Sequence, residues 1–394
     1  MKAMVAPSPG SPGALRRANR ERVLEILEAG ASLAQAEIAR RTGLAASTVS
    51  TLVQQLAAEG AVTVADGASR GRAARLVSLA APSGVVVGID HGRFHLSVAI
   101  ADFQGVILAE RRVLREGGIS REESLGRVDR LIAEALAEAG IERAEIRGGA
   151  LALPAPIDSR TGRVGSAAIL PGWTDIDPAS ACSEILGFPV SVYNDTNLGA
   201  LGEARWGAGR GVSDLVYIWV SEGVGAGLIL NGELYSGTGG IAGELGHSVH
   251  RRDSGDLCRC GNRGCLETVV STRAVIRLLE PHVGPLAGFD QVVELAERGD
   301  VLCQRVLAET GRHIGVSVAN LVNLVDPQRI VIGGELARAG ELLIEAVAQM
   351  VRQYAIPSTA ATVEIVPAEL GDRAELLGAV SAALDECVRL SKVN

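Results

Sequence analysis

Hydrophobic and polar positions at the start of the chain follow the spacing of helices. Apolar residues recur on one side of the segment 14–30, and a shorter helix is predicted at 33–41. After a turn at Thr42-Gly43-Leu44, the segment 45–59 has the same periodicity. These elements predict a helix, a glycine turn and a second helix.

The helix predicted at 45–59 leaves hydroxyl and amide side chains on its outer face. These residues are Ser47, Thr48, Ser50, Thr51 and Gln54. Such side chains can reach phosphates and base edges in the major groove of DNA. Two apolar runs then flank a turn that carries Arg70 and Arg72, which predicts a β-hairpin wing. The segment 14–81 is therefore predicted to be a winged helix-turn-helix DNA-binding domain, although three small helices can also form a protein-interaction module.

Residues 1–13 are rich in Pro, Ser and Gly and are predicted to be a disordered tail, and 80–84 resembles a linker.

Beyond this linker, the sequence pattern predicts strands joined by tight turns. The predicted strands are 85–89, 96–102 and 106–113, followed by a helix at 124–139, and a comparable unit begins at Asp214 with a strand at 215–220 and a glycine turn at 221–227. Residues 82–394 are thus predicted to form two α/β lobes with mixed sheets, produced by duplication.

Composition and charge narrow the classes of protein. The chain of 394 residues is 47% hydrophobic and 21% charged, and no apolar run reaches the roughly 18 residues of a membrane helix. A soluble, cytoplasmic protein with no membrane partner is predicted. Its first 81 residues hold ten Lys/Arg against six Asp/Glu, whereas the remainder holds 28 against 40. This asymmetry indicates that only the N-terminal domain binds nucleic acid.

The segment 243–267 concentrates residues that bind metals. His247 and the run Cys258-x-Cys260-x4-Cys265 supply the four ligands of a closed Cys3His zinc site. Since all four positions would come from protein, this Zn²⁺ is predicted to be structural. The alternative is a cluster of free or disulfide-bonded cysteines, but six cysteines in a chain without a signal peptide favour a reducing compartment.

Two carboxylates flank these potential ligands. Glu244 lies three residues before His247, and Glu267 lies two residues after Cys265. A metal that held both ends of the loop would fix both carboxylates, and fixed acceptors of this kind suit a polyhydroxylated ligand. The alternative is that both are solvated surface acids.

The motifs of the chain resemble those of a known family. They are Leu170-Pro171-Gly172-Trp173, Asn194-Asp195, Glu244-Leu245-Gly246-His247, the cysteine run from Cys258 to Glu267, and Ile332-Gly333-Gly334. With the N-terminal domain, they resemble transcriptional regulators of the ROK family (repressors, open reading frames and sugar kinases), which includes xylose and glucose-type sugar repressors. The resemblance implies an actin-like, hexokinase-like fold of two lobes with a sugar between them. It also implies that the sugar contacts Asn194, Asp195, Glu244, His247 and Glu267, with His247 a zinc ligand as well.

Whether the chain is also a kinase depends on two turns that bind phosphate in kinase members of the family. Their residues here are Asp90-His91-Gly92-Arg93-Phe94 and Ser221-Glu222-Gly223-Val224-Gly225. Bulky side chains and a carboxylate stand where the family has Gly and Thr, so that ATP binding is expected to be poor. A sugar kinase with a DNA-binding domain stays open as the alternative, because Asp195 matches the kinases' general base.

The resemblance therefore predicts a sugar-responsive transcriptional regulator, most often a repressor, and not an enzyme. Its partners would be operator DNA, a sugar and further copies of the chain in a homodimer or homotetramer. A repressor controlled by a protein partner, with no small ligand, is a third hypothesis.

Overall fold

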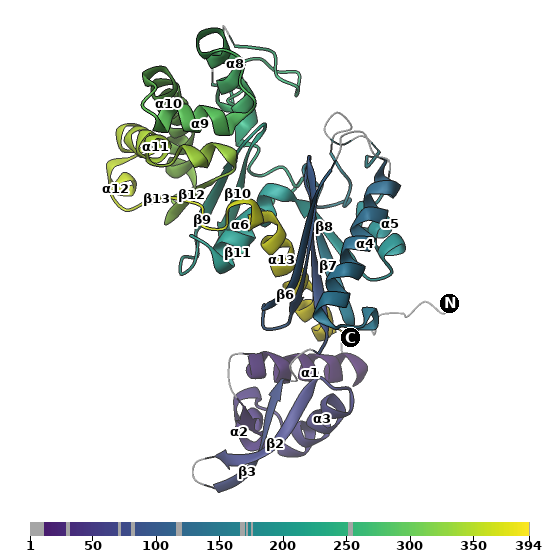
Figure 1. Ribbon diagram of the computed structural model, residues 1–394. Coiled ribbons are helices and arrows are strands. Elements are labelled where there is room, and N and C mark those ends of the chain that lie inside the picture. Colours follow the sequence, from purple (N-terminus) through teal and green to yellow (C-terminus); the bar gives the residue numbers. More distant parts are fainter. Residues whose placement is uncertain are drawn as a thin grey trace. The chain divides into compact units, whose positions relative to one another are not determined.

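The structure is a computed structural model of the 394-residue chain. It describes residues 12–28, 32–69, 72–79, 83–115, 120–165, 170, 172–174, 176–250 and 255–393. The chain divides into two compact units, Met1–Ser83 with Glu386–Asn394, and Gly84–Asp385 (Figure 1). In the described part of the chain, no helix combines the length and the apolar character needed to cross a bilayer.

The first unit combines three helices with a small antiparallel sheet. Its elements are α1 Pro12–Glu28, β1 Leu33–Ala34, α2 Gln35–Thr42, α3 Ala46–Ala58, β2 Val62–Ser69 and β3 Arg72–Leu79, with strand order β1-β3-β2. Gly43 ends α2 with a φ of 72°, a conformation that needs no Cβ, and turns the chain into α3. Val23, Ile38 and Val77 are fully buried in one shared core. The predicted winged helix-turn-helix is confirmed.

Two boundaries in this unit differ from the predicted ones. Helix α1 begins at Pro12, ahead of Ala14, because proline fits the first turn of a helix, so the last two residues of the predicted tail are helical. Leu33 and Ala34 were expected in a helix but pair with β3 as strand β1. Residues 1–11 of the predicted tail and 80–82 of the predicted linker lie outside the described residues.

Two five-stranded sheets of the same topology form the second unit. Their orders are β6-β5-β4-β7-β8 and β11-β10-β9-β12-β13. The strands are β4 Val85–His91, β5 His95–Asp102, β6 Ile107–Leu114, β7 Ile146–Leu153, β8 Val190–Asn194, β9 Leu215–Val220, β10 Val224–Leu230, β11 Glu233–Leu234, β12 Arg329–Gly333 and β13 Glu364–Pro367. In both sheets the first three strands are antiparallel neighbours and the last two run parallel to the first. The predicted pair of α/β lobes is confirmed.

Helices cover both sheets. They are α4 Arg121–Ala139, α5 Pro178–Leu186, α6 Asp195–Trp206, α7 Glu267–Val270, α8 Thr272–Val283, α9 Phe289–Glu297, α10 Val301–Val325, α11 Glu341–Tyr354, α12 Pro357–Ala360 and α13 Ala374–Val393. Strand β4 is buried along its whole length, as expected for a strand covered on both faces. Each sheet has its own apolar core, with α4 on the first and α10 and α11 on the second.

Helix α13 packs closely against both α6 and β4. A Cβ at Gly202 of α6 would lie 2.3 Å from the carbonyl oxygen of Ala374, and one at Gly88 of β4 would lie 2.6 Å from the side chain of Val380. Contacts this short leave no room for side chains, so the backbones fix one another. Helix α13 is therefore in close contact with the two elements that carry Asp90, near the end of β4, and Asp195, at the start of α6.

The predicted glycine turn at 221–227 is shorter in the structure. Strand β10 already begins at Val224, and Gly225 and Gly227 belong to it. Glycine is needed there because α6 lies against the strand: a Cβ at Gly225 would come within 2.8 Å of the Thr196 hydroxyl oxygen. These glycines had been interpreted as turn residues, but helix packing explains them.

Candidate functional site

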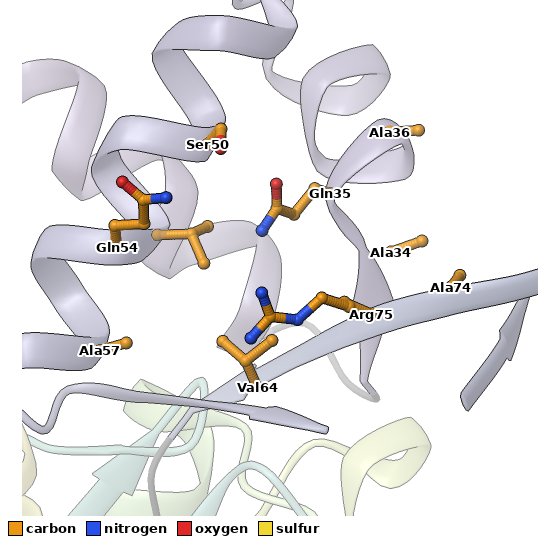
Figure 2. A pocket seen from close by; sticks show the side chains of 10 residues that line it. Ala34, Gln35, Ala36, Ser50, Gln54, Ala57, Val64, Ala74 and Arg75 are labelled. Carbon is orange, nitrogen blue, oxygen red and sulfur yellow. The ribbon is translucent and has the colours of Figure 1, made fainter. Parts of the chain in front are cut away.

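Helix α3 carries the polar face that was predicted to contact DNA. Ser47, Thr51 and Gln54 are exposed, and Thr48 and Ser50 are half-buried. The Thr51 hydroxyl donates a hydrogen bond to the carbonyl oxygen of Ser47 at 3.0 Å, so it is partly engaged within the helix. Figure 2 shows Ser50 and Gln54 on the side of α3 that faces the start of α2 and strand β3.

The predicted wing is a long hairpin. Strands β2 and β3 pair continuously from Val62 with Leu79 to Ser69 with Arg72. Arg72 is therefore the first residue of β3, and Arg70 lies outside the described residues. Contact of these arginines, and of the α3 residues, with DNA stays a prediction.

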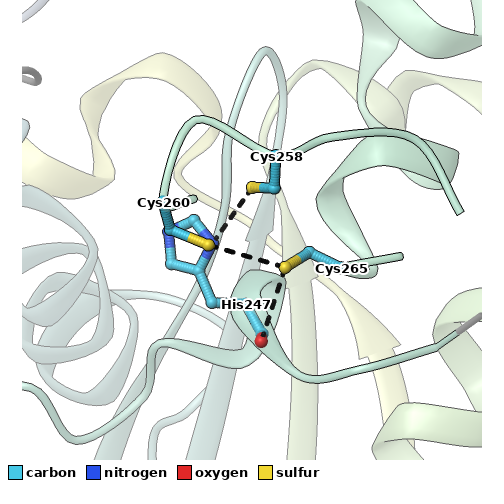
Figure 3. Close-up of side chains that lie close together, drawn as sticks. All are labelled: His247, Cys258, Cys260 and Cys265. Atoms are coloured by element: carbon cyan, nitrogen blue, oxygen red, sulfur yellow. Dashed lines mark hydrogen bonds between the residues drawn. The ribbon is translucent and has the colours of Figure 1, made fainter. Parts of the chain in front are cut away.

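Four potential metal ligands converge in the second unit. The ligand atoms of His247, Cys258, Cys260 and Cys265 all lie within 4.8 Å of one another (Figure 3). The Sγ atoms of Cys260 and Cys265 are 3.6 Å apart, and Sγ of Cys258 is 3.5 Å from Nδ1 of His247. A tetrahedral ion with metal–sulfur bonds of about 2.3 Å separates its sulfur ligands by about 3.8 Å. The four side chains therefore have the spacing of a tetrahedral metal site.

Short backbone contacts shape the loop around this site. Isolated β-bridges pair Val249 with Cys265 and Leu257 with Arg263. In the turn between Leu257 and Arg263, the Gly261 N–H donates a hydrogen bond to the carbonyl oxygen of Cys258 at 3.0 Å, and Gly261 has a φ of 91°. This tight turn brings the cysteines to one side of the loop, as the spacing predicted.

Glu267 begins α7 directly beyond the metal loop, and its side chain is buried. It is 8% exposed, and its Oε2 accepts hydrogen bonds from the Arg259 guanidinium at 2.8 Å and from the Val224 N–H at 3.3 Å. Arg259 lies between two of the potential ligands, so this ion pair ties the loop to Glu267. Nothing in the local sequence indicates this role of Arg259, because the sequence does not show where a long side chain at the loop surface will reach.

Glu244 lies beside the second ring nitrogen of His247. Its Oε2 is 3.7 Å from Nε2 of His247. Burial raises the pKa of Glu244, nearby His247 and Arg259 oppose that rise, and Glu267 adds to it. The loop therefore brings Glu244, His247 and Glu267 together, and the imidazole has its Nδ1 toward the cysteines and its Nε2 toward a carboxylate.

Asn194 and Asp195 join this group from the start of α6. Asn194 is the N-cap, and its Oδ1 accepts from the Asn197 N–H at 3.1 Å while its Nδ2 donates to Oδ1 of Asp195 at 3.1 Å. Burial raises the pKa of Asp195 to about 7, hydrogen bonds from Thr196 oppose the rise, and the charges of Asp90 and Glu244 add to it. We call Asp195, Glu244 and Glu267 the acidic cluster.

Two turns of this chain, at 90–94 and 221–225, correspond to those that were expected from the resemblance to bind phosphate in kinases. The first of them is covered by a histidine of its own sheet. Nε2 of His95 lies 2.5 Å from Oδ2 of Asp90, and Asp90 is 2% exposed. A Cβ at Gly92 would lie 2.3 Å from the His95 ring, so the imidazole packs directly on the backbone of this turn.

The two turns are also joined to each other. Nη1 of Arg93 in the first turn lies 3.0 Å from Oε2 of Glu222 in the second. The repulsion expected between Glu222 and a phosphate is therefore reduced, because Arg93 neutralises this carboxylate.

Other polar groups near these sites were not predicted. Burial raises the pKa of Glu375, at the start of α13, well above its ordinary value, and Asp90 and Asp195 add to the rise. Nε2 of His250 and Nδ1 of His313 lie 2.8 Å apart. Their contact joins the segment directly after His247 to α10, across 63 residues of sequence that carry no local sign of it.

His91, in the first turn, is a buried histidine that packs within its own lobe. It is 1% exposed, its Nε2 lies 2.6 Å from the Ser124 hydroxyl oxygen, and its ring meets Trp173 edge-on. Burial lowers its pKa to about 4, so the imidazole is neutral at physiological pH.

Comparison with known proteins identifies relatives for both units. Residues 86–386 match the ROK family, and residues 16–63 match a winged helix-turn-helix DNA-binding family. The xylose repressor of Caldicellulosiruptor bescii is 29% identical, with 96% of this chain and 98% of that protein covered. A glucokinase of Thermotoga maritima is 32% identical, with 75% of this chain and 96% of that one covered.

A solved structure has the same fold along nearly the whole chain. The crystal structure of a ROK family transcriptional regulator, a homologue of the Escherichia coli Mlc protein, matches with a TM-score of 0.77. It is 24% identical in sequence, and the match covers 96% of this chain and 99% of that one.

Proposed function

We propose, since the chain belongs to the ROK family and carries a winged helix-turn-helix ahead of its ROK domain, that it is a sugar-responsive transcriptional repressor. The observation that carries the proposal is end-to-end similarity to a xylose repressor, because both the DNA-binding part and the ROK part align. Its partners would then be operator DNA and a sugar, and it would act in the cytoplasm, where the DNA is.

The acidic cluster is the proposed sugar site. Carboxylates accept hydrogen bonds from several sugar hydroxyls, and Asp195, Glu244 and Glu267 present three of them in one region. His247 would contribute Nε2, which already faces Glu244. Asn194 would act mainly by orienting Asp195, because its amide is engaged in capping α6 and in a hydrogen bond to that carboxylate.

We propose Zn²⁺ as the ion of the Cys3His site. Its ligands would be Nδ1 of His247 and the thiolates of Cys258, Cys260 and Cys265, a donor set typical of structural zinc. With four protein ligands, the ion would supply rigidity and would leave no open position for water. Its effect on sugar binding would pass through His247 and through Arg259, which holds Glu267.

A sugar kinase is the second candidate. The raised pKa of Asp195, about 7, favours it, because a carboxylate with this pKa can accept a hydroxyl proton near neutral pH. The packing of His95 on the first turn and the Arg93–Glu222 ion pair support loss of nucleotide binding instead. We therefore propose that the chain keeps a sugar site without kinase activity.

Regulation would follow from a population shift. A sugar bound in the acidic cluster would favour one arrangement of the two lobes, and DNA would favour another. Repressors with a helix-turn-helix commonly bind two half-sites as dimers, so a homodimer or homotetramer would make operator binding sensitive to this shift.

The test is a DNA titration with the full-length protein. A duplex selected in vitro by the protein from a random library is titrated at fixed salt, alone and with a panel of pentoses, hexoses and N-acyl hexosamines. We expect one sugar class to weaken DNA binding at least tenfold. Phosphate transfer from ATP to any of these sugars would instead establish the kinase, and DNA binding that no sugar changes would contradict the sensor.

A further inference from the structure

A groove of about 510 Å³ lies between α2, α3 and the hairpin of the first unit. Its lining combines small apolar residues with a few polar ones: Ala34, Gln35, Ala36, Ser50, Val53, Gln54, Ala57, Val64, Ala74 and Arg75. Figure 2 shows the polar ends of Gln35, Gln54 and Arg75 directed toward the same space. Only Ser50 and Gln54 of this set were predicted to contact DNA.

The chemistry of the groove suits an anion. Arg75 is exposed, and among the described residues of the lining it is the one that carries a charge, with no carboxylate among them. The amides of Gln35 and Gln54 and the Ser50 hydroxyl can donate hydrogen bonds beside it. The alanines and valines leave the space between these groups open.

The position of the groove on the domain indicates which anion it would bind. It borders the same helix as the exposed Ser47 and Thr51, but it lies on the flank of α3 that carries Ser50 and Ala57. When a recognition helix lies in the major groove, its flanks meet the sugar-phosphate backbone.

We propose that this groove holds a phosphate of the DNA backbone. Arg75 supplies the positive charge, and Gln35 and Gln54 supply hydrogen bonds. The proposal rests on the proposed DNA-binding function and assigns two residues, Gln35 and Arg75, that the recognition helix alone does not include. A phosphate contact positions the protein on the duplex without reading its sequence.

The main test is Arg75→Gln in the full-length protein, with Arg22→Gln, an exposed arginine of α1, as the matched control. Each phosphate contact contributes about −0.9 to the slope of log K against log salt, so its loss weakens binding about eightfold near 0.1 M salt. We expect this loss, with the smaller slope, on both the selected duplex and a scrambled one. Arg22→Gln should leave the slope unchanged.

A second variant separates binding from folding. Gln35→Glu places a negative charge in the first turn of α2, where the helix dipole favours it, but directly in the proposed phosphate site. We expect unchanged or higher thermal stability together with DNA binding at least tenfold weaker. Ala57→Leu, which narrows the groove without changing charge, should also weaken binding to both duplexes.

One acidic residue on the hairpin gives an opposite prediction. Asp66 is the residue directly across from Arg75 in the β2–β3 pairing. Asp66→Asn should therefore tighten binding to both duplexes, because it strengthens the positive field around Arg75.

The outcomes distinguish this proposal from the function on which it rests. Wild-type protein that binds no duplex would overturn both. DNA binding that persists unchanged in Arg75→Gln would overturn the groove alone, and so would a loss confined to the selected duplex with an unchanged salt slope, because Arg75 would then read a base.

Discussion

The acidic cluster and the two turns belong to the same unit but treat their charges in opposite ways. At the turns, Arg93 pairs with Glu222 and His95 contacts Asp90. In the acidic cluster, burial without enough neighbouring positive charge raises the pKa of Asp195 and of Glu244. The charges at the turns are compensated within the chain. In the acidic cluster Glu267 pairs with Arg259, whereas Asp195 has no ion pair among the described residues.

This difference distinguishes charged side chains that are already paired within the fold from carboxylates that remain available to a ligand. A buried carboxylate with a raised pKa makes the fold less stable at neutral pH, and such groups concentrate at sites that bind or react. An exposed ion pair such as Arg93–Glu222, with side chains 62% and 39% exposed, adds little stability and needs no ligand. These differences are what we would expect if, as proposed, the acidic cluster binds a sugar and the turns no longer bind a nucleotide.

Loss of the metal should have the largest effect, because it would disturb the loop that carries Glu244 and Glu267. Cys265→Ser removes one of the four ligands, and we expect loss of bound zinc and a decrease in the free energy of unfolding on the order of 4 kcal/mol. Metal content and denaturant unfolding measure both. Cys387→Ser, a half-buried cysteine outside the cluster, is the control. Unchanged sugar affinity in metal-free Cys265→Ser would contradict the role given to the loop.

The second largest effect is expected from removal of the Asp195 carboxylate, which should weaken sugar binding. Asp195→Asn replaces a carboxylate acceptor by a neutral amide, and a hydrogen bond to a charged group contributes about 1.5–3 kcal/mol. We expect sugar affinity to fall about 10- to 100-fold in calorimetric titration. Asp290→Asn, on an exposed aspartate of α9, should have no such effect. Full affinity in Asp195→Asn would remove this residue from the site.

Stability should depend on pH through the same residue. The folded protein holds the Asp195 proton up to a pKa of about 7, whereas the unfolded chain releases it near the ordinary value of 3.8. The unfolded state is therefore favoured progressively as pH rises from about 4 to about 7. Unfolding measured across this range should show this decline in wild type and less of it in Asp195→Asn. Parallel pH profiles would show that Asp195 is ionised in the fold.

The smallest effect is expected at the turns. A double-mutant cycle with Arg93→Ala and Glu222→Ala should give a coupling of about 0.2–1 kcal/mol that decreases with salt. Sugar affinity should not change in either variant. A coupling of several kcal/mol would mean that the turns are held together much more rigidly than an exposed ion pair allows.

Much of the fold followed from periodicity and motif spacing. Helical spacing before residue 60 and strand spacing after residue 84 predicted the winged helix-turn-helix and the repeated α/β lobes. The boundaries were less accurate, because pairing of Leu33 with Val77 and packing of Gly225 against Thr196 involve distant partners. Local pattern carries no information about either contact.

The chain by itself determined which residues could bind a metal, because the ligands of a tetrahedral site must lie close together and the segment 243–267 brings all four within one loop. Only the tertiary structure decided which side chains meet, at the metal loop and elsewhere. Arg259 reaches Glu267, Arg93 meets Glu222 across the two sheets, and Gln35 and Arg75 share a groove. These pairs depend on the path of the backbone and on how far long side chains reach. Burial shifts the pKa of Asp195, and burial exists only once the chain has folded.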